Sequence, residues 1–170
     1  TDAAAQGYST DIEIVRPTFS HKGLPGIDTP LFAAQPTMRI GLLHQYERDP
    51  LILYQFGEEL GGEGNGAVVK HRNAMALGVS YDFSPAVGAR VILPMALHSG
   101  SAIPELAADG FGLEDMSVGV RFRGFQVGGF ALGARADFTA PIGAKESFHG
   151  EDGLRTGAGL LASFESGPIT

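Results

Sequence analysis

Arginines recur along this sequence between small residues, and their side chains are the ones best suited to specific polar chemistry. A guanidinium is always charged and presents five N–H donors in a rigid fork that matches a carboxylate or a phosphate. Acidic residues recur on the same face of the expected strands, so the sequence predicts a shared polar lining. The predicted lining residues are Arg39, Arg72, Arg90, Arg121, Arg123, Arg135, Arg155, Asp82, Asp137 and Glu165.

Two functions fit such a lining. Rings of arginine favour anions in channels, which predicts a selectivity filter. Alternatively, arginines and acids pair as an internal ion-pair network, across neighbouring strands and also along one strand, as Arg135 and Asp137 would. A barrel of roughly eight strands has room inside only for side chains, so we favour the structural network. A larger barrel would favour a pore.

The elements that position these residues alternate along the chain. Apolar residues take the odd positions of residues 87–97 and the even positions of residues 130–140, and most of the large ones are among them. A period of two is typical of β-strands. The opposite face holds Gly, Ala and Arg, which cannot build a dry core but can line a barrel whose bulky face meets lipid. The sequence therefore predicts an all-β fold, an antiparallel up-and-down transmembrane β-barrel.

Seven to eight strands are visible in this pattern. The expected strands are 37–47, 51–56, 68–83, 86–98, 114–123, 129–142 and 153–165, with a bend at residues 48–50. Bacterial single-chain barrels close with an even number of strands. Either a short strand near Ile12 supplies the eighth, or the chain is the front part of a larger barrel; we favour the second.

Two regions differ in character. Residues 1–36 are expected to form an irregular Pro/Gly-rich N-terminal arm with one short strand that tucks into or under the barrel. Residues 37–170 are expected to form a barrel domain that continues beyond the chain end. Tight turns at Ser84–Pro85 and 124–128 alternate with long loops at 57–66, 99–113 and 143–152. This alternation places the tight turns in the periplasm and the long loops outside.

Composition excludes several classes of function. A formal net charge of −7 argues against a nucleic-acid surface, and the absence of Cys excludes disulfides and thiolate sites. The histidines form no zinc-ligand spacing, and the acidic loop residues, among them Glu114 and Asp115, are expected to be solvated. Because no hydrolase, phosphate-loop or dinucleotide motif occurs, we expect no enzyme activity, no metal and no cofactor.

Several short segments carry a family resemblance. Residues 46–54, 77–83 and 92–95 resemble the N-terminal barrel of OmpA-family outer-membrane proteins of the myxobacterial and deltaproteobacterial type. Residues 107–116 and 140–143 are also similar to segments of transporter-like barrels of MetA-pathway phenol degradation. The resemblance implies that further strands follow and, in OmpA-type members, a soluble peptidoglycan-binding domain. It implies no catalytic residues.

The pattern and the resemblance together predict a barrel in the outer membrane of a Gram-negative cell, with a structural, anchoring or surface-interaction role. Its expected partners are outer-membrane lipid and another surface or envelope protein bound through loops 57–66, 99–113 and 143–152. A solute-transporting porin-like channel is one alternative. The other is a soluble lipocalin-like barrel, whose hydrophobic ligand would lie against inward-facing Phe83, Phe122, Phe130 and Phe138.

Overall fold

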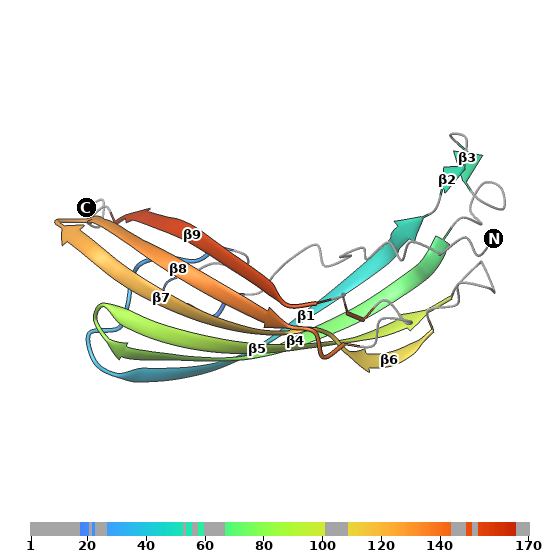
Figure 1. Ribbon diagram of the computed structural model, residues 1–170, viewed down its shortest axis with the longest axis horizontal. Helices are drawn as coiled ribbons and strands as arrows, with labels where there is room; N and C mark the ends of the chain where they lie inside the picture. The colour runs from blue at the N-terminus through green and yellow to red at the C-terminus, as the bar shows by residue number, and fades with distance from the viewer. Residues whose placement is uncertain are drawn as a thin grey trace, which may run out of the picture.

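The computed structural model describes residues 18–20, 22, 27–52, 54–55, 58–59, 67–100, 109–143, 149–150 and 153–165. These residues form one seven-stranded antiparallel sheet and a separate two-stranded hairpin (Figure 1). Within this part of the chain there is no helix that is long and apolar enough to cross a membrane. The strands are β1 (Thr37–Ile52), β2 (Tyr54–Gln55), β3 (Glu58–Glu59), β4 (Ala67–Ser84), β5 (Val87–Ser99), β6 (Gly110–Leu113), β7 (Met116–Val127), β8 (Phe130–Ala140) and β9 (Arg155–Phe164).

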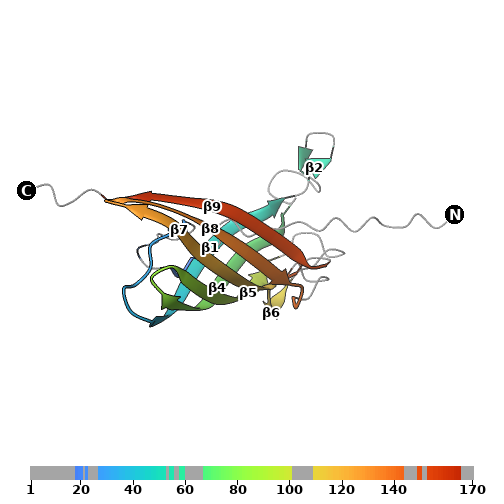
Figure 2. The same ribbon diagram turned by 60° about the vertical axis from the view of Figure 1, so that its left-hand side comes forward.

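The strands follow one another across the main sheet in the order β1-β4-β5-β7-β8-β9, and β6 also pairs with β5. Every neighbouring pair is antiparallel, so the predicted antiparallel all-β fold is confirmed. The sheet is strongly curved, as Figures 1 and 2 show. It is not closed: β1 and β9 are its two edges, and the described residues do not join them into the expected barrel.

Turn lengths differ between the two ends of the sheet. Short turns at 85–86 and 128–129 join β4 to β5 and β7 to β8 at one end. The connections from β1 to β4, from β5 to β7 and from β8 to β9 lie at the other end and are longer. The expected strand near Ile12 and most of the predicted long loops lie outside the described residues.

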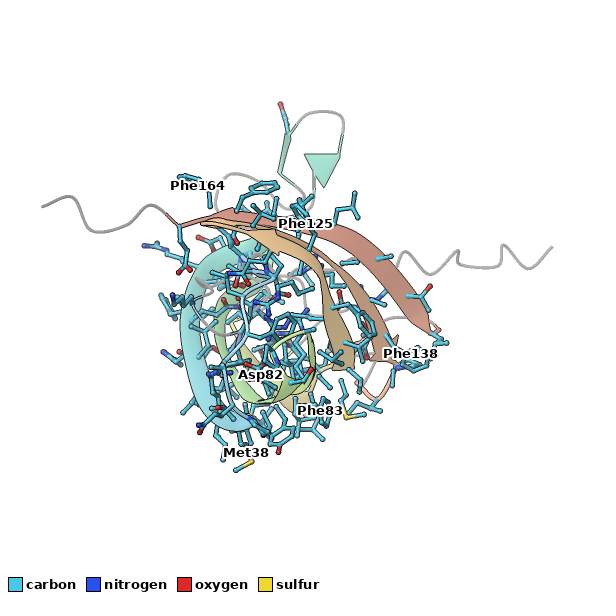
Figure 3. The ribbon with its side chains drawn as sticks, turned by 90° about the vertical axis from the view of Figure 1, so that its left-hand side faces the viewer. Met38, Asp82, Phe83, Phe125, Phe138 and Phe164 are labelled. Carbon is cyan, nitrogen blue, oxygen red and sulfur yellow. The ribbon has the colours of Figure 1, made fainter. Side chains whose placement is uncertain are left out.

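Side chains alternate between the two faces of the sheet in the inverted sense that the sequence predicts. Along β4, Ala74 and Ala76 are buried, whereas Met75, Leu77 and Val79 are exposed. Figure 3 shows the same division: Asp82 points into the hollow of the sheet, and Met38, Phe83, Phe125, Phe138 and Phe164 lie on its outside. Arg72 and Arg121 are among the largest fully buried side chains, where a water-soluble core would place apolar residues.

Part of the N-terminal arm lies inside the hollow. We call residues 28–33 the inner segment, and within it Asp28, Leu31 and Phe32 are buried. The amide of Ala33 donates to Asp82 Oδ2 at 3.0 Å, which fixes the inner segment against β4. Upstream, Ser80 Oγ donates to the carbonyl oxygen of Phe19 at 2.6 Å. The inner segment thus fills space that the small residues of the concave face leave open.

Two expected chain breaks are β-bulges. The bend at residues 48–50 does not end the strand, because β1 continues to Ile52 with a register shift between Arg48 and Leu51. The bulge places one more residue on β1 than on β4, and Asp49 within it has a φ of 50°. Likewise β7 runs through Gly124 with a shift between Arg123 and Phe125, so the expected turn at 124–128 narrows to residues 128–129.

Two expected loops contain strand residues. The predicted strand 51–56 and loop 57–66 include the short hairpin of β2 and β3. The predicted loop 99–113 contains β6, which continues the line of β7 along β5 after a break at residues 114–115. The break lies opposite Pro94, whose carbonyl oxygen accepts from the amide of Glu114 at 2.9 Å. Proline has no backbone N–H and cannot donate the second hydrogen bond of an antiparallel pair, so the hydrogen bonding between β5 and its neighbour is interrupted there.

Candidate functional site

The concave face carries the predicted charged residues in rows that cross the sheet. In one row, Asp82 on β4 faces Gly88 on β5, which in turn faces Arg121 on β7. In the next row, Arg90 on β5 faces Gly119 on β7, which faces Asp137 on β8. Each row therefore places opposite charges on two strands with a glycine on the strand between them.

Asp82 is the centre of the first cluster, and its side chain is fully buried. Arg39 Nη1 donates to Oδ2 at 2.9 Å, and Arg121 Nη2 donates to Oδ1 at 3.1 Å. Arg121 also donates to the carbonyl oxygen of Thr29 at 2.9 Å and lies 4.7 Å from the centre of the Phe32 ring. Strands β1 and β7 and the inner segment are thereby held together at the carboxylate of Asp82.

Asp28 of the inner segment is the centre of the second cluster. Its Oδ2 accepts from Arg90 Nη1 at 2.5 Å and from Arg135 Nη1 at 3.2 Å, and its side chain has no exposed area. Arg90 Nη2 donates to Asp137 Oδ1 at 2.7 Å, and Arg135 Nε lies 3.4 Å from Asp137 Oδ2. Two arginines and two aspartates alternate in space, so each charge has a partner of opposite sign.

Arg72 is the centre of the third cluster, near the end of the sheet with the long connections. Its Nη1 donates to Glu47 Oε2 at 2.9 Å and its Nη2 donates to Glu114 Oε1 at 2.5 Å. The guanidinium is completely buried, and an isolated charge there would be strongly destabilising. Nearby, Arg155 Nη2 lies 3.7 Å from Asp115 Oδ2, and Asp115 Oδ1 accepts from the amide of Gly143 at 3.1 Å.

Two of the predicted lining residues lie apart from these clusters. Arg123 forms a hydrogen bond with Gln126 near the turn between β7 and β8. Glu165 follows β9 and forms an exposed ion pair with Lys22. The other predicted lining residues lie on the concave face and take part in the clusters described above.

Two glycines make these clusters possible because charged side chains pass directly over them. A Cβ at Gly119 would lie 2.6 Å from Asp137 Oδ1 and 2.9 Å from Arg90 Nε. A Cβ at Gly88 would lie 2.8 Å from Asp82 Oδ1. A side chain at either position would displace the carboxylate from its arginine.

Replacing Gly119 with alanine is therefore expected to lower the free energy of unfolding by about 1–3 kcal/mol, the range for overpacking at a tight site. The matched control is Gly157→Ala on β9, because a Cβ there would meet only Asp137 Cβ, at 4.0 Å. Urea unfolding in detergent micelles measures both. Equal stability of the two variants would show that the Arg90–Asp137 pair is not held over Gly119.

Several residues of these clusters were not predicted from the sequence. Glu114 and Asp115 were expected to be solvated loop acids, but both are buried and bind Arg72, Arg155 and the backbone. Their position directly before β7 could have indicated this burial, since residues at the end of a strand can still point inward. Asp28 lies in an irregular segment without periodicity, so no pattern in the sequence marked it as a partner.

A pair of histidines that are distant in the sequence also lies on the concave side. His98 on β5 and His149 stack with ring centroids 4.2 Å apart and planes inclined by 15°. Both are buried, and His149 Nε2 lies 3.1 Å from the carbonyl oxygen of Ala96. The described residues contain no group of three or more His, Cys, Asp or Glu side chains placed to hold a metal ion.

Comparisons with protein-family models, with curated proteins and with solved structures found no match. The resemblance to OmpA-family barrels therefore stays a prediction.

Proposed function

We propose that this chain belongs to an integral β-barrel of a Gram-negative outer membrane, with a structural or anchoring role in the envelope. One observation carries the proposal. Large apolar side chains are exposed on the convex face of the strands, while the arginines and aspartates of the concave face pair with one another, and Arg72, Arg90, Arg121, Asp28 and Asp82 among them are buried. Soluble monomers rarely expose contiguous apolar patches larger than on the order of a few hundred Å².

The same proposal accounts for the open edges. In lipid, each unpaired backbone N–H or C=O group costs several kcal/mol, so a spanning sheet must close. β1 and β9 are the strands that need further partners. We propose that additional strands pair with them, which makes this sheet the front part of a larger barrel of the OmpA type.

The orientation of four phenylalanines argues against a lipocalin-like binding protein. Such a barrel would hold its ligand against inward-facing Phe83, Phe122, Phe130 and Phe138. Their exposed fractions are 54%, 46%, 38% and 43%, so they instead lie on the convex face. A porin-like channel remains the second candidate, because arginines line the hollow. The inner segment occupies part of that hollow, which favours the structural role.

The end of the sheet with the long connections is the natural binding surface. We propose that it faces outward and that loops 57–66, 99–113 and 143–152 contact another surface or envelope protein. The short turns at 85–86 and 128–129 then face the periplasm, as in other up-and-down barrels.

Cell fractionation tests the proposal. We expect the chain to be recovered with the outer membrane and to be released only by detergent, because its apolar convex face needs lipid or detergent. Protease added to intact cells is expected to cut within the long connections and to spare the short turns. Recovery in the detergent-free soluble fraction would contradict the proposed function, and cleavage only at the short turns would reverse the orientation.

A further inference from the structure

A cavity of about 410 Å³ lies on the concave face, with walls from β5, β7, β8 and β9. Its volume falls within the usual range for small-molecule sites, about 300–1,000 Å³. Its charged walls come from the second cluster and from Arg155 and Asp115. The polar and charged side chains that line this part of the cavity are Arg90, Arg135, Arg155, Asp115, Asp137 and Thr139.

The more exposed charges in the lining of this cavity are positive. The side chains of Arg135 and Arg155 are 36% and 32% exposed, whereas those of Asp115 and Asp137 are 6% and 19% exposed. The carboxylates each have two partners within the protein: Asp115 accepts from the amide of Gly143 and lies 3.7 Å from Arg155, and Asp137 accepts from Arg90 and lies 3.4 Å from Arg135. A solute would therefore meet guanidinium groups before carboxylates.

Gly157 on β9 and Asp137 on β8 lie between the levels of the two more exposed arginines. On the ladder between β8 and β9, Arg135 faces Gly159, Asp137 faces Gly157 and Thr139 faces Arg155. Arg135 and Arg155 thus lie on either side of Gly157. A Cβ at Gly157 would meet only one atom, Asp137 Cβ, at 4.0 Å, so the floor of the cavity is unfilled there.

We propose that this cavity binds a small solute through an oxyanion group, a carboxylate or a phosphate, held between Arg135 and Arg155. The chain already shows this chemistry next to the cavity, where Arg90 and Arg135 together hold the carboxylate of Asp28. The proposal rests on the proposed function, because closing the barrel turns the concave face into an enclosed lumen.

The test is a titration of the full chain in detergent micelles with inorganic phosphate, followed by the Nε–Hε resonances of its arginines in NMR spectra. Chloride at matched ionic strength controls for screening. We expect saturable shifts at Arg135 and Arg155 and none at Arg123, which pairs with Gln126 away from the cavity. A parallel titration with acetate shows whether phosphate or carboxylate is preferred, according to which saturates at lower concentration.

Two variants make the test specific. Arg155→Gln removes one guanidinium and is expected to weaken binding about tenfold or more, as the loss of a charge-assisted hydrogen bond does. Gly157→Leu fills the floor without changing charge and is expected to abolish saturation. Its matched control is Gly124→Leu, since a Cβ at Gly124 meets nothing within 4 Å and the residue lies outside the cavity lining.

The site is overturned if neither phosphate nor acetate gives a saturable shift, if the shifts are equal at Arg123, or if saturation persists in both Arg155→Gln and Gly157→Leu. These outcomes are distinguishable from failure of the proposed function. Recovery of the chain in the soluble fraction would overturn the membrane proposal, whereas a flat titration of membrane-recovered chain would overturn only the binding site.

Discussion

Replacing Asp82 with alanine is expected to lower the free energy of unfolding by about 3–5 kcal/mol, the usual effect of removing one partner from a buried ion pair. The carboxylate is fully buried and accepts hydrogen bonds from Arg39, Arg121 and the amide of Ala33. Without it, two guanidinium groups remain in the hollow with less compensation. The inner segment also loses its attachment to β4.

Heat-modifiable migration on gels measures this effect, because folded barrels resist SDS until they are boiled. Asp137→Ala is expected to be destabilising to a smaller degree, since Asp137 is 19% exposed. The control is Asp109→Ala, which removes an exposed carboxylate before β6 and should change stability by at most about 0.5 kcal/mol. Unfolding of all three variants at the parent temperature would show that the concave face is not an enclosed ion-pair lining.

Replacing Leu77 with arginine is expected to lower the free energy of unfolding in lipid vesicles by about 2–4 kcal/mol, the cost of a cation at the lipid midplane of a barrel. Leu77 is 41% exposed on the convex face and lies between Leu42 of β1 and Leu93 of β5. In water, the same substitution at an exposed position would change stability by at most about 0.5 kcal/mol. The size of the effect therefore distinguishes a lipid-facing surface from a solvent-facing one.

Urea unfolding of vesicle-inserted protein supplies the measurement for Leu77→Arg. Val127→Arg is the matched control, because Val127 is also exposed but ends β7 beside a short turn, where the expected cost is about 0–1 kcal/mol. A neutral Leu77→Arg variant would contradict the proposed contact of the convex face with lipid.

Which residues face inward was predictable from the sequence because the period of a strand is local. Once residues 87–97 and 130–140 are seen to alternate, the side of every residue in them follows. The antiparallel order of the sheet followed in the same way from the short turns between successive strands. These features depend on neighbours in the chain, so no long-range information was needed.

The identity of the ion pairs was not predictable in this way. Arg135 and Asp137 were expected to pair along one strand, but Arg90, on a different strand, makes the shorter contact with Asp137. That contact depends on the register across β7, which places Gly119 between the two charges. The contacts of Asp28 depend on where the irregular inner segment returns to the sheet. Irregular backbone has no period, so these contacts could not be inferred from the sequence.

The predicted strand boundaries were wrong where backbone hydrogen bonding, rather than the polarity of the side chains, decides where a strand ends. Pro50 was expected to bend the chain, but a bulge at Asp49 lets β1 continue past it. Pro94 lies in the middle of β5, and its effect appears on the neighbouring strand as the break between β6 and β7. The polarity pattern of residues 99–113 contained too few alternations to mark β6.

Site-directed spin labelling tests whether the convex face of the sheet meets lipid, because the chain has no cysteine and each introduced one is unique. Single cysteines at successive positions from Ala74 to Tyr81 of β4 would be labelled and their accessibility to oxygen measured in lipid vesicles. We expect a period of two, with maxima at Met75, Leu77, Val79 and Tyr81 and minima at the buried positions between them. Maxima at the buried positions, or no alternation at all, would contradict a sheet that faces lipid with its convex side.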